Sequence, residues 1–130
     1  MGTMGRVPVV LAILLCAGTV ACNWEAPQSA RDVKNPVPSS AQNLKQAQSL
    51  FNGNCAICHG IAGRGDGTIA ESCAPEPANF TDSKLMDAET DGSLFWKITN
   101  GHDSMPGFGW QISETQLWQL VNFIRTFAKH

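Results

Sequence analysis

The stretch Cys55-Ala56-Ile57-Cys58-His59 decides how the rest of the chain is interpreted. Two thiols three positions apart, followed at once by a histidine, form the C-x-x-C-H pattern through which a c-type haem is attached. The thiols of Cys55 and Cys58 are spaced to form thioethers with the two vinyl groups of one porphyrin. His59 is then placed to coordinate the iron from one face. The motif therefore predicts one covalently bound haem c.

The second iron ligand is sought further along the chain, in Ser104-Met105-Pro106-Gly107-Phe108. A methionine on the face opposite the histidine raises the reduction potential of a haem. Met105 is one candidate, and Pro106 would stiffen the loop that carries it. Met86 competes for this place but is expected to pack as an ordinary apolar side chain. His102 competes as well and is expected to be a solvated loop residue.

Two other chemistries use a C-x-x-C pair. A zinc site needs four ligands, and the chain has no second C-x-x-C or H-x-x-x-H; Cys55, Cys58, Cys73 and His102 together have an unusual spacing. A thioredoxin-like motif needs a βαβ context, which the sequence lacks. Cys73 is expected to be a small, partly buried side chain. Haem attachment is therefore the favoured interpretation.

The N-terminus has the pattern of a secretory signal over residues 1–21, with Arg6 before an apolar run from Val7 to Val20. The run is shorter than the 20 or so apolar residues that span a bilayer. Thr19-Val20-Ala21-Cys22 resembles the lipobox of bacterial lipoproteins, although that pattern prefers Leu at the place of Thr19. We expect Cys22 to be lipidated, because an unmodified N-terminal thiol would be reactive in an oxidising compartment. Ordinary cleavage that leaves a free thiol is the alternative.

The next segment, residues 22–40, carries three prolines among polar residues and no apolar periodicity. This composition predicts an extended tether between the lipidated cysteine and a domain over residues 41–130. Without Arg6 the mature chain has 8 basic and 11 acidic residues, a balance of about −3. That balance argues against nucleic acid as a partner, because nucleic-acid binding needs a concentrated basic surface.

The domain is predicted to be all-α. One helix is predicted with Ser39 as its N-cap, Gln42 completing a capping box, and an end at Gly53. A second spans Asp91–Asn100, preceded by a short turn over residues 82–86, and a third begins after a capping box of Ser113 and Gln116. The core is thin for a free-standing domain, so a covalent haem would supply its apolar centre.

Residues from about Ser40 to Ala128 resemble a class I cytochrome c, similar to the single-haem modules attached to bacterial respiratory complexes. The motifs that carry the resemblance are Leu50-Phe51, Gly-x-Gly-Asp-Gly at Gly63 to Gly67, Pro77-Ala78-Asn79-Phe80, Leu94-Phe95-Trp96-Lys97-Ile98-Thr99-Asn100-Gly101 and Met105-Pro106. The resemblance implies a small cytochrome c fold of about four short helices wrapped around one haem c.

The resemblance also implies roles for single residues. His59 and Met105 would be the axial ligands of the haem iron, and a backbone carbonyl of Pro75 or Pro77 would hold the other ring nitrogen of His59. From the residues themselves, three tryptophans are candidates to line the haem or to hydrogen-bond a propionate through the indole N–H, with Trp96 or Trp110 favoured over Trp118. The alternatives are core packing for Trp96 and surface exposure for Trp118. The first helix would cross the last one at Ala47, where the family usually has Gly, and Phe51 would then pack against Leu120 and Phe123.

The function implied is single-electron transfer by a membrane-tethered carrier, or by a subunit of a bacterial respiratory complex, on the periplasmic side of the inner membrane. Its partners would be redox proteins, such as a respiratory complex or a terminal oxidase, with the lipid anchor holding it at the membrane. No catalytic residue and no small-molecule substrate are expected, because both axial positions of the iron would be filled. A haem enzyme or a gas sensor with a labile sixth ligand is the alternative.

Overall fold

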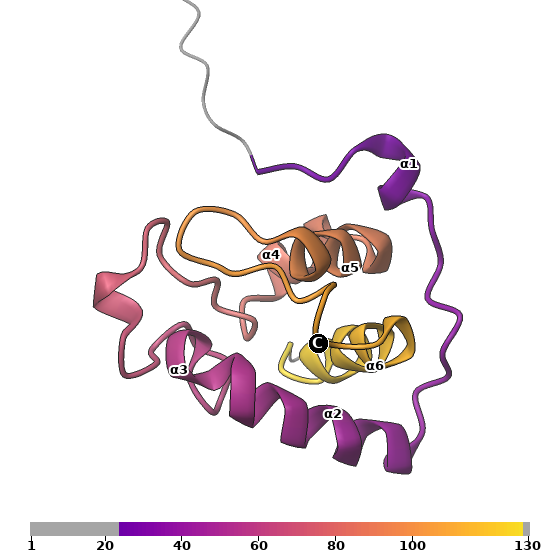
Figure 1. Ribbon diagram of the computed structural model, residues 1–130, viewed down its shortest axis with the longest axis horizontal. Coiled ribbons are helices and arrows are strands. Elements are labelled where there is room, and N and C mark those ends of the chain that lie inside the picture. The colour runs from indigo at the N-terminus through magenta and orange to yellow at the C-terminus, as the bar shows by residue number, and fades with distance from the viewer. Residues whose placement is uncertain (1–23, 129–130) are drawn as a thin grey trace, which may run out of the picture.

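Helices α2 (Ala41–Asn54) and α6 (Glu114–Arg125) cross against each other and form the main packing contact of the molecule (Figure 1). Ala47 is fully buried at this crossing, where a small side chain lets the two helix backbones approach. The predicted partner of Phe51 is confirmed, since its ring lies 5.4 Å from that of Phe123. Leu120 is fully buried in the same hydrophobic core.

The computed structural model describes residues 24–128. Within this range the other helical elements are α1 (Gln28–Arg31), α3 (Ala56–His59), the short 3-10 turn η1 (Ala70–Ser72), α4 (Ser83–Ala88) and α5 (Asp91–Asn100). Extended pairing in the described chain amounts to an isolated bridge between His102 and Met105. The prediction of an all-α fold is therefore confirmed. None of the described helices combines the length and apolar character needed to cross a bilayer.

The helix boundaries follow their capping residues. Helix α6 begins after the predicted capping box, in which the Ser113 side chain accepts from the Gln116 backbone and Gln116 returns the contact. Helix α5 has the predicted bounds and ends before Gly101, whose φ of +68° is the left-handed conformation that glycine favours. Helix α2 begins one residue later than predicted, because the cap is Ser40 rather than Ser39.

Arg125, near the end of α6, connects that helix to α4 and α5. Its Nε donates to Asp91 Oδ1 over 2.9 Å, and its two terminal nitrogens donate to the backbone carbonyls of Met86 and Glu89. The planar guanidinium therefore serves three acceptors at the junction between α4 and α5. This contact fixes α5, and with it one wall of the site described below.

The segment predicted to be an extended tether is folded onto the domain from Trp24 onward, which corrects that prediction. Residues 24–37, here called the N-terminal strap, include α1 and continue down one side of the molecule to α2 (Figure 1). Helix α1 packs on α5 so closely that a Cβ added to Gly92 would lie 1.9 Å from the Ala30 carbonyl oxygen. The Thr90 hydroxyl donates to the Arg31 carbonyl over 2.9 Å.

A second contact secures the lower part of the strap. The Asn35 side-chain amide donates to the Trp118 carbonyl over 3.1 Å and to Asn122 Oδ1 over 3.0 Å. In return, the Asn122 amide donates to the Val37 carbonyl over 2.9 Å. The Asn35 side chain thus binds α6, while most of the other polar side chains of the strap are exposed.

Candidate functional site

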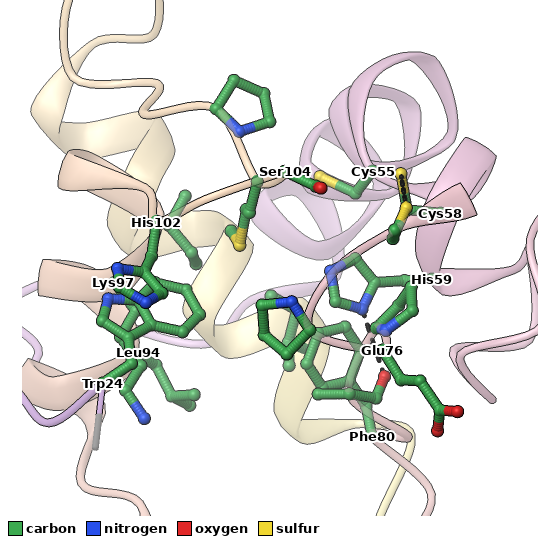
Figure 2. Close-up of a pocket in the computed structure, with 18 of the residues that line it drawn as sticks. Trp24, Cys55, Cys58, His59, Glu76, Phe80, Leu94, Lys97, His102 and Ser104 are labelled. Carbon is green, nitrogen blue, oxygen red and sulfur yellow. Dashed lines mark hydrogen bonds between the residues drawn. The ribbon is translucent and has the colours of Figure 1, made fainter. Parts of the chain in front are cut away.

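The four residues singled out by the sequence, Cys55, Cys58, His59 and Met105, line one cavity of about 230 Å³ (Figure 2). Helix α3 supplies the Cys58 and His59 side chains, and the turn after α5 supplies Met105. Most of the remaining lining is apolar and comes from every part of the described chain: Phe51, Phe80, Leu94, Ile98, Phe108 and Ile124. The fold thus brings the predicted residues together around a largely apolar space.

His59 is 9% exposed and is held on two sides. Its Nδ1 lies 3.1 Å from the Ala78 carbonyl oxygen, and its ring stacks on Phe80 with 4.5 Å between ring centres. The expected partner was the carbonyl of Pro75 or Pro77, and that expectation is wrong: the acceptor is Ala78, the residue after Pro77. An Nδ1–H that donates to this carbonyl leaves Nε2 as the nitrogen available to a metal.

Burial favours the neutral forms of the titratable side chains around His59. Burial lowers the pKa of His59, although the Ala78 carbonyl acts in the opposite direction, so the imidazole keeps its neutral form to lower pH than usual. Burial, with a smaller contribution from the neighbouring Cys58, raises the pKa of Cys55 to about 12. The pKa of Cys58 is also raised, first by burial and then by its contact with Cys73.

The glycine-rich loop after α3 folds back over that helix. The Gly67 N–H donates to the Cys58 carbonyl over 2.9 Å, and the Gly65 N–H donates to the His59 carbonyl over 2.8 Å. Gly65 has a φ of +77°, and a Cβ there would lie 2.5 Å from the Pro77 carbonyl oxygen. Only glycine fits this position, because the loop must pass between α3 and the segment that carries Ala78.

Met105 is held in a tight turn. His102 and Met105 exchange two backbone hydrogen bonds of 2.9 Å each, and Asp103 between them has a φ of +48°. The next contact joins this turn to the segment between Cys73 and Pro75: the Ser104 N–H donates to the Ala74 carbonyl over 3.2 Å, and the Ala74 N–H donates to the Ser104 hydroxyl over 3.0 Å. The position of Met105 is therefore restrained by hydrogen bonds at the middle of this turn.

His102 and the tryptophans differ in part from what the sequence predicted. The His102 side chain is 35% exposed and contacts Asp103, in line with a loop residue that meets solvent. It also lines the cavity, which was not expected, and its ring stacks on Trp24 with 5.4 Å between ring centres. Trp24 lines the cavity too, whereas Trp96 and Trp110 do not, and Trp110 is 83% exposed. Trp118 is buried rather than exposed and stacks on Phe95 at 4.0 Å. Sequence reasoning missed Trp24 because its neighbours have the composition of a linker.

The competing ligands are placed as follows. Met86 is 1% exposed and belongs to the hydrophobic core, as expected. Cys73 is half-buried, with its sulfur 3.5 Å from that of Cys58. Over residues 24–128 no three His, Cys, Asp or Glu side chains gather as a metal-binding cluster, so the zinc alternative gains no support. Cys22 lies outside the described residues.

The cavity suits the group that the motif predicts. Two thiols, an imidazole with Nε2 available and a thioether line one apolar space, which matches the needs of a porphyrin with two attachment points and two axial ligands. Polar side chains that line the space include Trp24 and Lys97, which lie across it from Cys55 and Cys58 (Figure 2).

Comparison with known proteins supports the same conclusion. The sequence model of the family described as cytochrome c oxidase, cbb3-type, subunit III matches residues 42–124. A cytochrome c6 from Alaria esculenta is 27% identical over 84 residues, which cover 65% of this chain and 91% of that protein. The cbb3-type cytochrome c oxidase subunit FixP of Azorhizobium caulinodans is 27% identical over 99 residues, 75% of this chain but only 32% of FixP.

Solved structures share the fold. The KustC0563 c-type cytochrome superposes with a TM-score of 0.58 at 23% identity, covering 64% of this chain and 98% of that one. A chain of the reducing HAO-like protein complex of Kuenenia stuttgartiensis gives a TM-score of 0.61 at 21% identity, covering 75% and 50%. The chain therefore belongs to the family of cbb3-type cytochrome c oxidase subunit III, and it is a class I c-type cytochrome that carries one covalently bound haem c.

Proposed function

We propose that this protein transfers single electrons through a haem c that is attached at Cys55 and Cys58 and ligated by His59 and Met105. The observation that supports this ligand pair is their placement. His59 lies on one wall of the cavity, and Met105 is paired through its backbone with His102, which lies on the facing wall (Figure 2). The iron of a haem held between them changes by one electron between its ferrous and ferric states.

The protein's own residues keep this site rigid. The Ala78 carbonyl and the Phe80 ring fix the orientation of His59, so the nitrogen that faces the cavity does not rotate away. The two hydrogen bonds between Ser104 and Ala74 restrain the Met105 turn. A restrained methionine argues against the alternative of a haem enzyme or gas sensor, which needs a labile sixth ligand.

Spectroscopy of variants tests the ligand assignment. The ferric protein should show a far-red charge-transfer band of methionine sulfur, and Met105→Ala should abolish this band and lower the reduction potential. Met86→Leu is the matched control, because Met86 is a buried methionine that does not line the cavity. A band that persists in Met105→Ala, or that disappears in Met86→Leu, would refute the assignment.

We propose further that residues 1–21 are a signal peptide and that a lipidated Cys22 holds the protein on the periplasmic side of a bacterial inner membrane. The lipobox-like sequence before Cys22 supports this. The electron partners would be redox proteins of a respiratory complex, in line with the names of the FixP relative and of the oxidase family. We propose no catalytic residue in this chain.

Fractionation tests the anchor. Cys22→Ser should release the protein from membranes into the periplasmic fraction with an unchanged haem spectrum, and mass spectrometry of the wild type should find acyl chains on Cys22. A wild-type Cys22 without acyl chains would contradict the anchor and leave the electron-transfer proposal intact.

A further inference from the structure

Trp24, in the N-terminal strap, contacts the turn that carries Met105. Its ring stacks on the ring of His102, with 5.4 Å between ring centres and 17° between the ring planes. The Lys97 ammonium lies 5.3 Å from the centre of the same tryptophan ring. Figure 2 shows these three side chains grouped on the side of the cavity that faces His59. The strap thus contacts the turn that holds the proposed methionine ligand.

His102 connects this stack to Met105 through the backbone. The His102 N–H donates to the Met105 carbonyl, and the Met105 N–H donates to the His102 carbonyl, each over 2.9 Å. Because both bonds join the two residues directly, a displacement of His102 displaces Met105 or breaks these bonds. A ring that restrains His102 therefore restrains Met105 as well.

Trp24 is itself held by the docked strap. Helix α1 follows it and packs on α5, where a Cβ added to Gly92 would lie 1.9 Å from the Ala30 carbonyl oxygen. Further along the strap, the Asn35 amide donates to α6. Trp24 also lies outside residues 42–124, which the family model matches. The stack is therefore a contact that the strap adds to the matched domain.

We propose that Trp24 is a positioning residue for the axial ligand: its stack on His102 holds the Met105 turn closed and so keeps the thioether on the haem iron. This inference rests on the proposed ligation by Met105. An aromatic pair of this kind changes an equilibrium constant by about threefold to tenfold. Without the stack, the open form of the turn should be more populated by that factor.

Exogenous imidazole measures how readily the turn opens. It binds the ferric haem iron only after the Met105 sulfur has left, so its apparent affinity follows the fraction of open turn. Trp24→Ala should therefore bind imidazole about threefold to tenfold more tightly than the wild type, as read from the loss of the far-red methionine band. Trp110→Ala is the matched control, because Trp110 is 83% exposed and does not line the cavity. An unchanged affinity in Trp24→Ala would overturn the proposal.

Two further variants separate the stack from a general loss of stability. Trp24→Phe keeps an aromatic ring against His102 and should bind imidazole with nearly the affinity of the wild type. In a His102→Ala background the stack is already absent while the backbone hydrogen bonds can still form, so Trp24→Ala should add nothing further. Additive effects of the two alanine substitutions, or an equal gain in Trp24→Phe and Trp24→Ala, would overturn the proposal. Each titration is made where circular dichroism shows the variant to be folded.

The contribution of the strap is tested at a distance from the stack. Gly92→Ala should displace α1 and raise the affinity for imidazole, whereas a Cβ at Gly53 meets nothing within 4 Å and Gly53→Ala should leave it unchanged. Equal affinities in these two variants would overturn the role of the strap. A wild type without the methionine band would refute ligation by Met105. A wild type that has the band, together with no effect of Trp24→Ala, would refute this inference alone.

Discussion

The contact between the strap and α5 can be tested by one methyl group. Gly92 and Gly53 are both helical glycines, but a Cβ at Gly92 would lie 1.9 Å from the Ala30 carbonyl oxygen, while a Cβ at Gly53 meets nothing within 4 Å. Gly92→Ala should therefore force α1 off α5. Gly53→Ala is a matched control that makes the same chemical change in open space.

The expected magnitudes have opposite signs. Alanine is favoured over glycine in a helix by up to about 1 kcal/mol, so Gly53→Ala should raise the free energy of unfolding by a fraction of that amount. At Gly92 the same gain is outweighed, because forcing a methyl into a packed contact costs about 1–3 kcal/mol and the displaced Arg31 carbonyl loses a hydrogen bond of about 1 kcal/mol. The two variants should thus differ by about 2 kcal/mol or more.

Guanidinium unfolding of both holoproteins, followed by circular dichroism, measures this difference. Displacement of the strap should also remove Trp24 from the cavity, so tryptophan emission should rise in Gly92→Ala and not in Gly53→Ala. If Gly92→Ala were as stable as Gly53→Ala and had the same emission as the wild type, the strap would not be packed as described.

Three further outcomes are expected. Cys55→Ala combined with Cys58→Ala should leave a largely unfolded chain, since the small core depends on the haem; a cooperative, native-like helical signal by circular dichroism would contradict this. Burial alone would raise the pKa of Glu89, but its hydrogen bonds with Lys97 and Ser93 lower it overall. The ionised Glu89 carboxylate therefore stabilises the fold above pH 4.5, and this stabilisation is lost as the pH falls toward the lower pKa of the folded state. Glu89→Gln has no carboxylate at this position. The free energy of unfolding of this variant should therefore fall less on acidification than that of the wild type. Arg125→Lys should lower the free energy of unfolding by about 2 kcal/mol, because an ammonium cannot serve three acceptors at once; urea titration with no shift in midpoint would refute this.

Local signals explain what could be predicted of the fold. The bounds of α5 and the start of α6 follow from caps and periodicity within a few residues, and both were predicted. The start of α2 was missed by one position because Ser39 and Ser40 are chemically equivalent caps, and only the path of the preceding chain chooses Ser40.

The strap could not be predicted, because the contacts that fold it are remote in sequence. Asn35 binds Trp118 and Asn122, more than 80 positions away, and α1 depends on the missing side chain of Gly92. No local pattern encodes either contact. A segment rich in proline and polar residues has the same composition whether it is solvated or docked.

In the candidate site, as in the fold, local sequence signals could be used for prediction and contacts remote in sequence could not. Cys55, Cys58 and His59 were predicted together because they form one contiguous motif, and Met105 because its Met-Pro pair resembles that of the family; all four line one cavity. The carbonyl that holds His59 belongs to Ala78 rather than to Pro75 or Pro77, a matter of loop register that spacing alone does not determine. Trp24 and His102 entered the cavity lining only through the fold of the strap.

The docked strap changes how far the haem domain can travel from a lipid at Cys22. Residues 23–40, if free and extended, would let the domain sweep up to about 60 Å from its anchor. With Trp24 fixed beside the cavity, only Asn23 separates the proposed acylated residue from the folded domain, a distance of about 7 Å at most. The domain would then sit on the bilayer with its Trp24 side turned toward the lipid, unable to swing between distant partners. A protein lipidated at Cys22 would then move mainly in the plane of the bilayer and would exchange electrons with partners close to that surface.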